Sequence, residues 1–186
     1  STMNPWTPIP SFSGNFDGAH MQISALTINL PAVQYVGLFS KLTTTSRIQS
    51  VHLQATVNGN YYAAGLAGEN RGVISTSYVS ASVTSASQST AGLVGYNYGT
   101  IESSSAYVTI SSAAMAGGLV GYNEGIIRNS YTQGTINAGD GGGLVGGVVS
   151  GEGKHAAGQR LLTLVITDRG DEQGVQAAAA KGAHGG

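Results

Sequence analysis

One ten-residue motif occurs twice in close succession, as Gly92-Leu-Val-Gly-Tyr-Asn97-Tyr-Gly99-Thr-Ile101 and as Gly118-Leu-Val-Gly-Tyr-Asn123-Glu-Gly125-Ile-Ile127. A third copy reads Gly65-Leu-Ala-Gly-Glu-Asn70-Arg-Gly72-Val-Ile74. Including two shorter copies, the motif begins at Gly37, Gly65, Gly92, Gly118 and Gly143, so neighbouring copies are 25 to 28 residues apart. Such a period is typical of a chain that builds one supersecondary unit after another and stacks each on its neighbour.

The residues that follow each Asn-x-Gly turn alternate between apolar and polar types. We align the repeats on Ile23, Ile48, Ile74, Ile101 and Ile127. Positions three, five and nine after each isoleucine are mainly apolar or small, and the positions between them are mainly polar. This period of two indicates β-strands with one buried face.

The composition also favours short strands joined by tight turns. Charged residues make up 9% of the 186 residues, and 29 residues are glycine. An average soluble domain has about 25% charged residues and about 7% glycine. Glycine, serine, threonine and asparagine therefore take the place of charged residues in this chain, which is typical of strands and turns.

These patterns predict an all-β chain that folds as a right-handed parallel β-solenoid of about five coils, since a parallel crossover is usually right-handed. An antiparallel sandwich of hairpins is disfavoured, because hairpin turns would not recur with identical flanking patterns. Residues 1–22 are expected to cap the first coil, residues 23–146 to form the solenoid, and residues 147–186 to be a partly ordered extension or linker. Whether each coil turns two or three corners stays open.

The repeated turn residues have a predicted structural role. The glycines are expected at turns, where glycine tolerates a positive φ. The asparagine side chains are expected to stack into a ladder that bonds turn backbone groups, or else to form a substrate-binding row. The predicted turn ladder comprises Asn70, Asn97 and Asn123 with Gly68, Gly95, Gly121, Gly72, Gly99 and Gly125.

The same stacking brings opposite charges into register. Lys41 and Glu69 occupy equivalent positions of adjacent repeats, as do Glu102 and Arg128. Each pair is therefore expected to face across neighbouring strands. Exposed pairs of this kind contribute only about 0.2 to 1 kcal/mol, so they would help to set the register rather than supply stability.

The repeated motif resembles the GLUG repeat of large bacterial surface proteins, and residues Phe12 to Ile23 look like the segment that often precedes such repeats. The resemblance covers roughly residues 6 to 146. GLUG repeats occur in adhesins, in haemagglutinin-like secreted proteins and in non-catalytic parts of immunoglobulin-cleaving peptidases. The resemblance therefore implies an extracellular or bacterial cell-surface location.

Several kinds of chemistry are not expected. The formal net charge is −1 and the basic residues are scattered, so the sequence has no basic patch that would bind nucleic acid. No apolar run is long enough to span a membrane. There is no cysteine, and none of the four histidines lies at metal-ligand spacing, so we expect no metal and no cofactor. Recurrent calcium-binding aspartates are missing, and the threonines do not form the continuous rank that would suggest ice binding.

The tyrosines mark a possible ligand surface. Tyr96 and Tyr122 share one repeat position next to Tyr98, whereas Tyr78 and Tyr131 share another, with His52 at the same position of the preceding repeat. Tyrosine combines apolar area with a polar tip and suits contacts with proteins and sugars. The same row could equally be packing between coils.

The sequence thus predicts a non-catalytic bacterial surface or secreted module of the adhesin type, acting as a rigid stalk or display surface for a host or matrix protein or a glycan. The alternative is a self-associating unit that stacks end to end through open solenoid edges. A carbohydrate-active β-helix enzyme comes third, because the acids Asp17, Glu69, Glu102, Glu124 and Asp140 fall at different repeat positions and form no compact pair.

Overall fold

The computed structural model describes residues 6–87 and 89–148, and within these ranges the regular structure consists of β-strands. Sheet A contains β1 (Ile9–Phe12), β4 (Phe39–Leu42), β7 (Ala67–Asn70), β11 (Val94–Asn97), β14 (Val120–Asn123) and β17 (Val145–Val148). Sheet B contains β2 (Asn15–Asp17), β5 (Arg47–Gln49), β8 (Val73–Ser75), β12 (Thr100–Glu102) and β15 (Ile126–Arg128). Sheet C contains β3 (Gln22–Asn29), β6 (His52–Gly59), β9 (Tyr78–Ser85), β13 (Ser105–Gly117) and β16 (Tyr131–Gly142), with the short β10 (Thr90–Ala91) paired to the end of β13.

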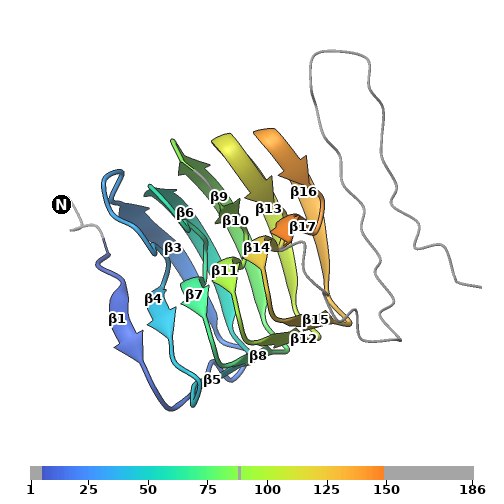
Figure 1. The fold of residues 1–186 in the computed structure, drawn as a ribbon. Helices are drawn as coiled ribbons and strands as arrows, with labels where there is room; N and C mark the ends of the chain where they lie inside the picture. Colours follow the sequence, from blue (N-terminus) through green and yellow to red (C-terminus); the bar gives the residue numbers. More distant parts are fainter. Residues whose placement is uncertain (1–5, 88, 149–186) are drawn as a thin grey trace, which may run out of the picture.

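The chain visits sheets A, B and C in turn and then returns to sheet A one strand further along (Figure 1). Each strand therefore pairs in parallel with its equivalent in the next coil. Ile48, Ile74, Ile101 and Ile127, for example, form one continuous row through sheet B. The predicted parallel β-solenoid of about five coils is confirmed, and each coil turns three corners.

The first coil differs from the sequence alignment. Phe16, not Ile23, pairs with Ile48, whereas Ile23 pairs with Leu53 in sheet C. The alignment was wrong because the first coil has a phenylalanine where the later coils have isoleucine, and because a register shift follows Ile23. Strands β1 and β2 thus belong to the sheets although they lie in the range expected to form the cap.

The other end of the solenoid also differs slightly from the expected boundary. β17 continues to Val148 and pairs with β14, two residues beyond the expected end at 146. The rest of the C-terminal extension expected at 147–186 lies outside the described residues.

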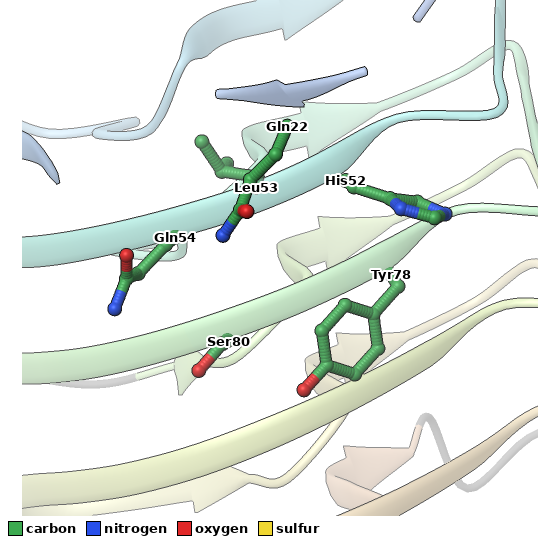
Figure 2. Close-up of a pocket in the computed structure, with 6 residues that line it drawn as sticks. All are labelled: Gln22, His52, Leu53, Gln54, Tyr78 and Ser80. Atoms are coloured by element: carbon green, nitrogen blue, oxygen red, sulfur yellow. The ribbon is translucent and has the colours of Figure 1, made fainter. Parts of the chain in front are cut away.

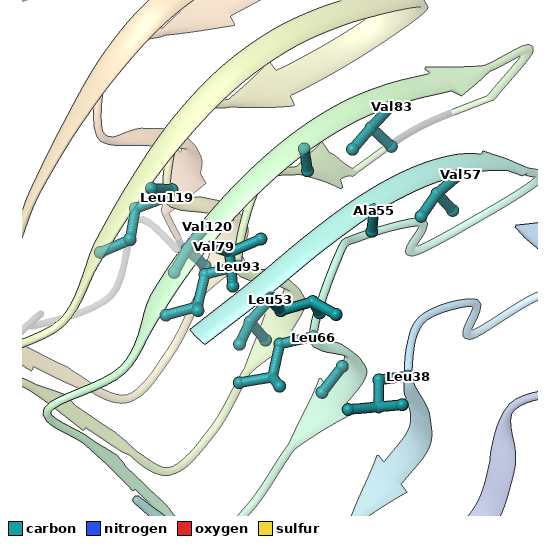
Figure 3. Packing of buried hydrophobic residues seen from close by; sticks show 14 of the residues in the cluster. Leu38, Leu53, Ala55, Val57, Leu66, Val79, Val83, Leu93, Leu119 and Val120 are labelled. Carbon is teal, nitrogen blue, oxygen red and sulfur yellow. The ribbon is translucent and has the colours of Figure 1, made fainter. Parts of the chain in front are cut away.

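The core consists of rows of equivalent apolar side chains (Figure 3). The leucine of each Gly-Leu pair is buried in every repeat, as Leu38, Leu66, Leu93, Leu119 and Leu144. Sheet C contributes a second row that includes Leu53 and Val79, and a third that includes Val57 and Val83. Burying one such side chain stabilises the fold by roughly 1.5 to 3 kcal/mol, so each coil is stabilised mainly by the coils on either side of it.

Aromatic rings fill the core at the first coil. The Phe39 ring is fully buried, and its centroid lies 5.1 Å from that of Phe12 and 5.6 Å from that of Phe16. The Trp6 indole Nε1 donates a hydrogen bond to the Leu38 carbonyl over 3.3 Å. The bulky residues of the leader therefore pack against the N-terminal end of the core.

A row of buried serines supports the corner between sheets B and C. Ser77, Ser104 and Ser130 are each at most 3% exposed. The Ser104 Oγ accepts the backbone N–H of Ser77 over 3.2 Å and donates to the Glu102 carbonyl over 2.8 Å. Ser130 makes the same contacts one coil further on. These hydroxyls satisfy backbone groups that the corner leaves without a strand partner, because an unpaired buried group is costly.

The expectation of a positive φ at the motif glycines is wrong. Among the described glycines, only Gly14 and Gly134 have a positive φ. The motif glycines are required by close approach instead: a Cβ on Gly99 would lie 2.1 Å from the carbonyl oxygen of Gly72, and one on Gly125 would lie 2.1 Å from that of Gly99. Gly68, Gly95 and Gly121 lie inside strands, against backbone of the segments that lead into sheet A.

Gly99→Ala is therefore expected to lower the free energy of unfolding by about 1 to 3 kcal/mol or more, because the new methyl group overlaps backbone that cannot rotate away. Gly141→Ala is the matched control, since its Cβ would meet the nearest atom at 3.5 Å, an ordinary contact. Urea unfolding of both variants measures the difference. Equal stability of the two variants would contradict the close packing of the glycine corner.

Candidate functional site

The asparagine row lies inside the corner between sheets A and B. Asn70 Nδ2 donates to Asn97 Oδ1 over 2.8 Å, and Asn97 Nδ2 donates to Asn123 Oδ1 over 2.7 Å. The Asn70 Oδ1 also accepts the N–H of Gly72 over 3.1 Å. Asn70 and Asn97 are fully buried. Their amides are used within the protein, so this row is a structural ladder and offers no open groups for a substrate.

Four tyrosines form a second column on the outside of sheet A. The ring centroids of Tyr35 and Tyr62 are 4.8 Å apart, those of Tyr62 and Tyr96 are 5.4 Å apart, and those of Tyr96 and Tyr122 are 5.0 Å apart. The first two pairs are stacked. Tyr98 meets Tyr96 edge to face at 4.2 Å. The ring faces in this column are therefore largely occupied by other rings.

Charged groups flank the tyrosine column and are paired with one another. Glu69 is 4% exposed and lies 3.4 Å from Lys41 and 2.5 Å from Arg71. The Lys41 Nζ also lies 3.9 Å from the Tyr35 ring centroid, and the Arg71 guanidinium lies 4.3 Å from that of Tyr98. A buried carboxylate needs such partners, because desolvation without them is costly. The predicted pairing of Lys41 with Glu69 is confirmed.

The Tyr96 hydroxyl donates a hydrogen bond to Glu124. Burial is the main reason that the pKa of Tyr96 is raised, and this hydrogen bond adds to the effect. Burial likewise raises the pKa of Tyr62, with a further contribution from Tyr35. Because the rings lie against one another and the Tyr96 hydroxyl is paired with Glu124, the column is mainly packing between coils.

Sheet C presents a different kind of surface. Tyr78 and Tyr131 share one register position, with Ser105 between them. They are 40% and 51% exposed, and Tyr107 on the intervening strand β13 is 51% exposed. Sheet C therefore carries three accessible rings, and none of them is stacked against another tyrosine among the described residues.

A shallow groove opens beside Tyr78 on this face. It has a volume of about 330 Å³ and is lined by Gln22, His52, Leu53, Gln54, Tyr78 and Ser80 (Figure 2). The His52 ring meets the Tyr78 ring at 6.2 Å, edge to face, and meets the His20 ring at 5.4 Å. Apart from Leu53, which is buried in the core, the groove offers amide, imidazole, phenol and hydroxyl groups.

Beside the groove runs a row of hydroxyl groups. Its members lie in register on five successive strands, as Thr27, Thr56, Ser82, Thr109 and Thr135. The threonines alone form no continuous rank, as expected, because Ser82 stands between Thr56 and Thr109, but the mixed row of hydroxyl groups was not expected. The misaligned first coil concealed the position of Thr27, and serine takes the place of threonine in the third coil.

The site residues suggested by the sequence thus fall on separate faces. Tyr96, Tyr98 and Tyr122 belong to the sheet A side, and Tyr78 and Tyr131 to sheet C. The sequence reasoning missed Tyr107 and the groove residues Gln22, Gln54 and Ser80. A signal was present, because these residues occupy the polar positions that alternate with the buried ones along each strand and therefore face outward.

Four of the five acids of the described coils, Asp17, Glu69, Glu102 and Glu124, have partners of their own. Glu102 lies 2.6 Å from Arg128, which confirms the second predicted ion pair. Asp17 accepts the Gln49 amide over 2.8 Å. Within residues 6–87 and 89–148 no cluster of three or more His, Asp or Glu side chains is arranged to hold a metal ion. The same ranges contain no helix long and apolar enough to cross a membrane.

The family model of the GLUG motif matches residues 112–137, which run from the end of β13 through β14 and β15 into β16. The chain carries a GLUG motif. In this structure the motif corresponds to one full coil, with the Gly-Leu pair entering sheet A and the Asn-x-Gly turn leading to sheet B. No curated protein and no solved structure matches the chain. The motif and the fold together describe a structural repeat module.

Tyr96→Phe is expected to flatten the alkaline loss of stability. A tyrosine whose pKa is raised in the folded state contributes stability that is full below the unfolded value of about 10 and is lost as the pH rises above it. Urea midpoints at pH 8 to 11 measure the effect. Tyr61→Phe, at an exposed ring, is the control. Parallel curves for Tyr96→Phe and the wild type would contradict the assignment.

Proposed function

We propose that this chain is a non-catalytic module of a bacterial cell-surface or secreted protein, of the adhesin type, which holds the outer face of sheet C against a protein or glycan partner. One contrast supports the proposal. The aromatic and charged groups on sheet A are paired with one another, whereas the three rings on sheet C are open to solvent. Exposed tyrosines on a rigid scaffold cost little conformational entropy on binding.

The location outside the cell is part of the same proposal. It rests on the likeness of the repeats to the GLUG repeats of surface proteins. Because backbone ladders join each coil to the next, the lack of cysteine is compatible with this location. The partner contacts would be made by side chains that stand on strands rather than on loops, so the face keeps its shape when it binds.

Binding of the purified protein to immobilised matrix proteins and glycans tests this function. The wild type should bind at least one of them saturably. The double variant Tyr107→Ala and Tyr131→Ala should lose about tenfold or more in affinity, which corresponds to about 1.4 kcal/mol. Tyr61→Ala removes another exposed ring, which lies outside sheet C, and should bind like the wild type. Saturable binding that survives the double variant would overturn the choice of face.

Self-association by end-to-end stacking is the second candidate. Within the described residues, β2 and β3 pair on one side only, with β5 and β6, and such edges can accept another strand. Sedimentation from dilute to concentrated protein separates the candidates. Monomers throughout would favour display, and rods that lengthen with concentration would favour assembly. A carbohydrate-active enzyme remains the third candidate, and the internal pairing of Glu69, Glu102 and Glu124 argues against it.

A further inference from the structure

We propose that the outer face of sheet C binds an uncharged polysaccharide, with the chain lying across the strands along the solenoid axis and one sugar seated in the groove beside Tyr78. This inference deepens the proposed function, on which it rests, by naming the partner and the subsite.

The charge of the face decides the class of ligand. The five long strands of sheet C contain a single Asp, Glu, Lys or Arg residue, Asp140, near the end of β16. Lys41 and Arg71 lie on the sheet A side and Arg128 lies on sheet B, each in an ion pair. An acidic glycan would need cations on this face. An uncharged polymer matches it.

The groups on the face are those that recognise a neutral sugar. A sugar ring offers hydroxyls that both donate and accept, and the amides of Gln22 and Gln54 do the same, as does the Ser80 hydroxyl. The Tyr78 ring adds apolar area for the C–H face of a sugar, and its hydroxyl adds a polar tip. The groove is shallow and about 330 Å³ in volume, which suits one unit of a longer chain better than a whole small ligand.

The spacing between successive coils matches the spacing of units in a linear polysaccharide. Neighbouring strands lie about 4.8 Å apart, a length of the same order as one pyranose unit in an extended chain. Equivalent side chains therefore recur along the axis at about the spacing of successive sugars. Tyr78, Tyr107 and Tyr131 lie on three consecutive strands in this direction. The hydroxyl row from Thr27 to Thr135 runs parallel to them, so a polymer on this face meets polar partners in every coil.

Two other occupants fit less well. A protein interface usually has a contiguous apolar centre within a polar rim, whereas here the rings are separated by hydroxyl and amide groups. An ice surface would suit the hydroxyl row, but the exposed rings of Tyr78 and Tyr107 interrupt a flat contact.

Affinity electrophoresis tests the inference, with gels that contain xyloglucan, galactomannan, hydroxyethylcellulose or pullulan, and with alginate and polygalacturonate as acidic controls. At least one neutral polymer should retard the wild type. Raising the salt from about 50 to about 500 mM should leave this retardation unchanged, because no charge pair is involved. Tyr78→Ala should raise the dissociation constant about tenfold or more and Gln54→Ala severalfold. Tyr61→Ala should match the wild type, and circular dichroism checks that every variant is folded.

Retardation by the acidic polymers alone, or equal retardation of Tyr78→Ala and Tyr61→Ala, would overturn the inference. If matrix proteins bind through Tyr107 and Tyr131 while no neutral polymer retards the protein, the inference fails and the proposed function stands. If neither a protein nor a polymer binds, both fail.

Discussion

Hydrogen bonding between equivalent positions of neighbouring coils is the interaction on which the whole structure depends. It requires each backbone to approach the next closely at the corners, and the row through Gly72, Gly99 and Gly125 allows this because a Cβ there would overlap a carbonyl oxygen of the preceding coil. The buried amides of Asn70 and Asn97 then join the coils at the same corner. The apolar rows, the ion pairs and the tyrosine column follow from this register, since side chains at equivalent positions of successive coils lie next to one another.

This constraint explains which features the sequence could predict. Where the repeat is regular, each residue lies beside the equivalent residue of the next coil. The row that contains Ile74 and the ion pairs Lys41–Glu69 and Glu102–Arg128 could therefore be predicted from the repeat length. The alignment of the first coil could not be predicted in this way, because Phe16 stands in place of isoleucine. The contact of Tyr96 with Tyr122 could be predicted because they share a repeat position, but the extension of the column to Tyr35 and Tyr62 could not. These two residues come from connecting segments, and their contact with Tyr96 depends on how those segments approach sheet A.

The two aromatic surfaces show how similar residues acquire different roles. On sheet A, stacked rings, buried Glu69 and its cations satisfy one another and stiffen the module. On sheet C, the inward side chains complete the core while the outward ones are mostly short, uncharged and open, with Tyr78, Tyr107 and Tyr131 as the largest. The same strands thus supply both a rigid support and an accessible polar face, which is the arrangement that a display module needs.

The register of neighbouring coils is the central claim, and thiol bridging measures it directly in a chain without cysteine. Thr56 and Ser82 are paired and exposed on sheet C, whereas Thr84 pairs with Asn58. In Thr56→Cys with Ser82→Cys the thiols belong to strands about 4.8 Å apart, and in Thr56→Cys with Thr84→Cys the separation is about 8 Å. Dibromobimane becomes fluorescent when it bridges two nearby thiols. The in-register pair should give the stronger signal, and an equal or stronger signal from the second pair would contradict the stacking described here.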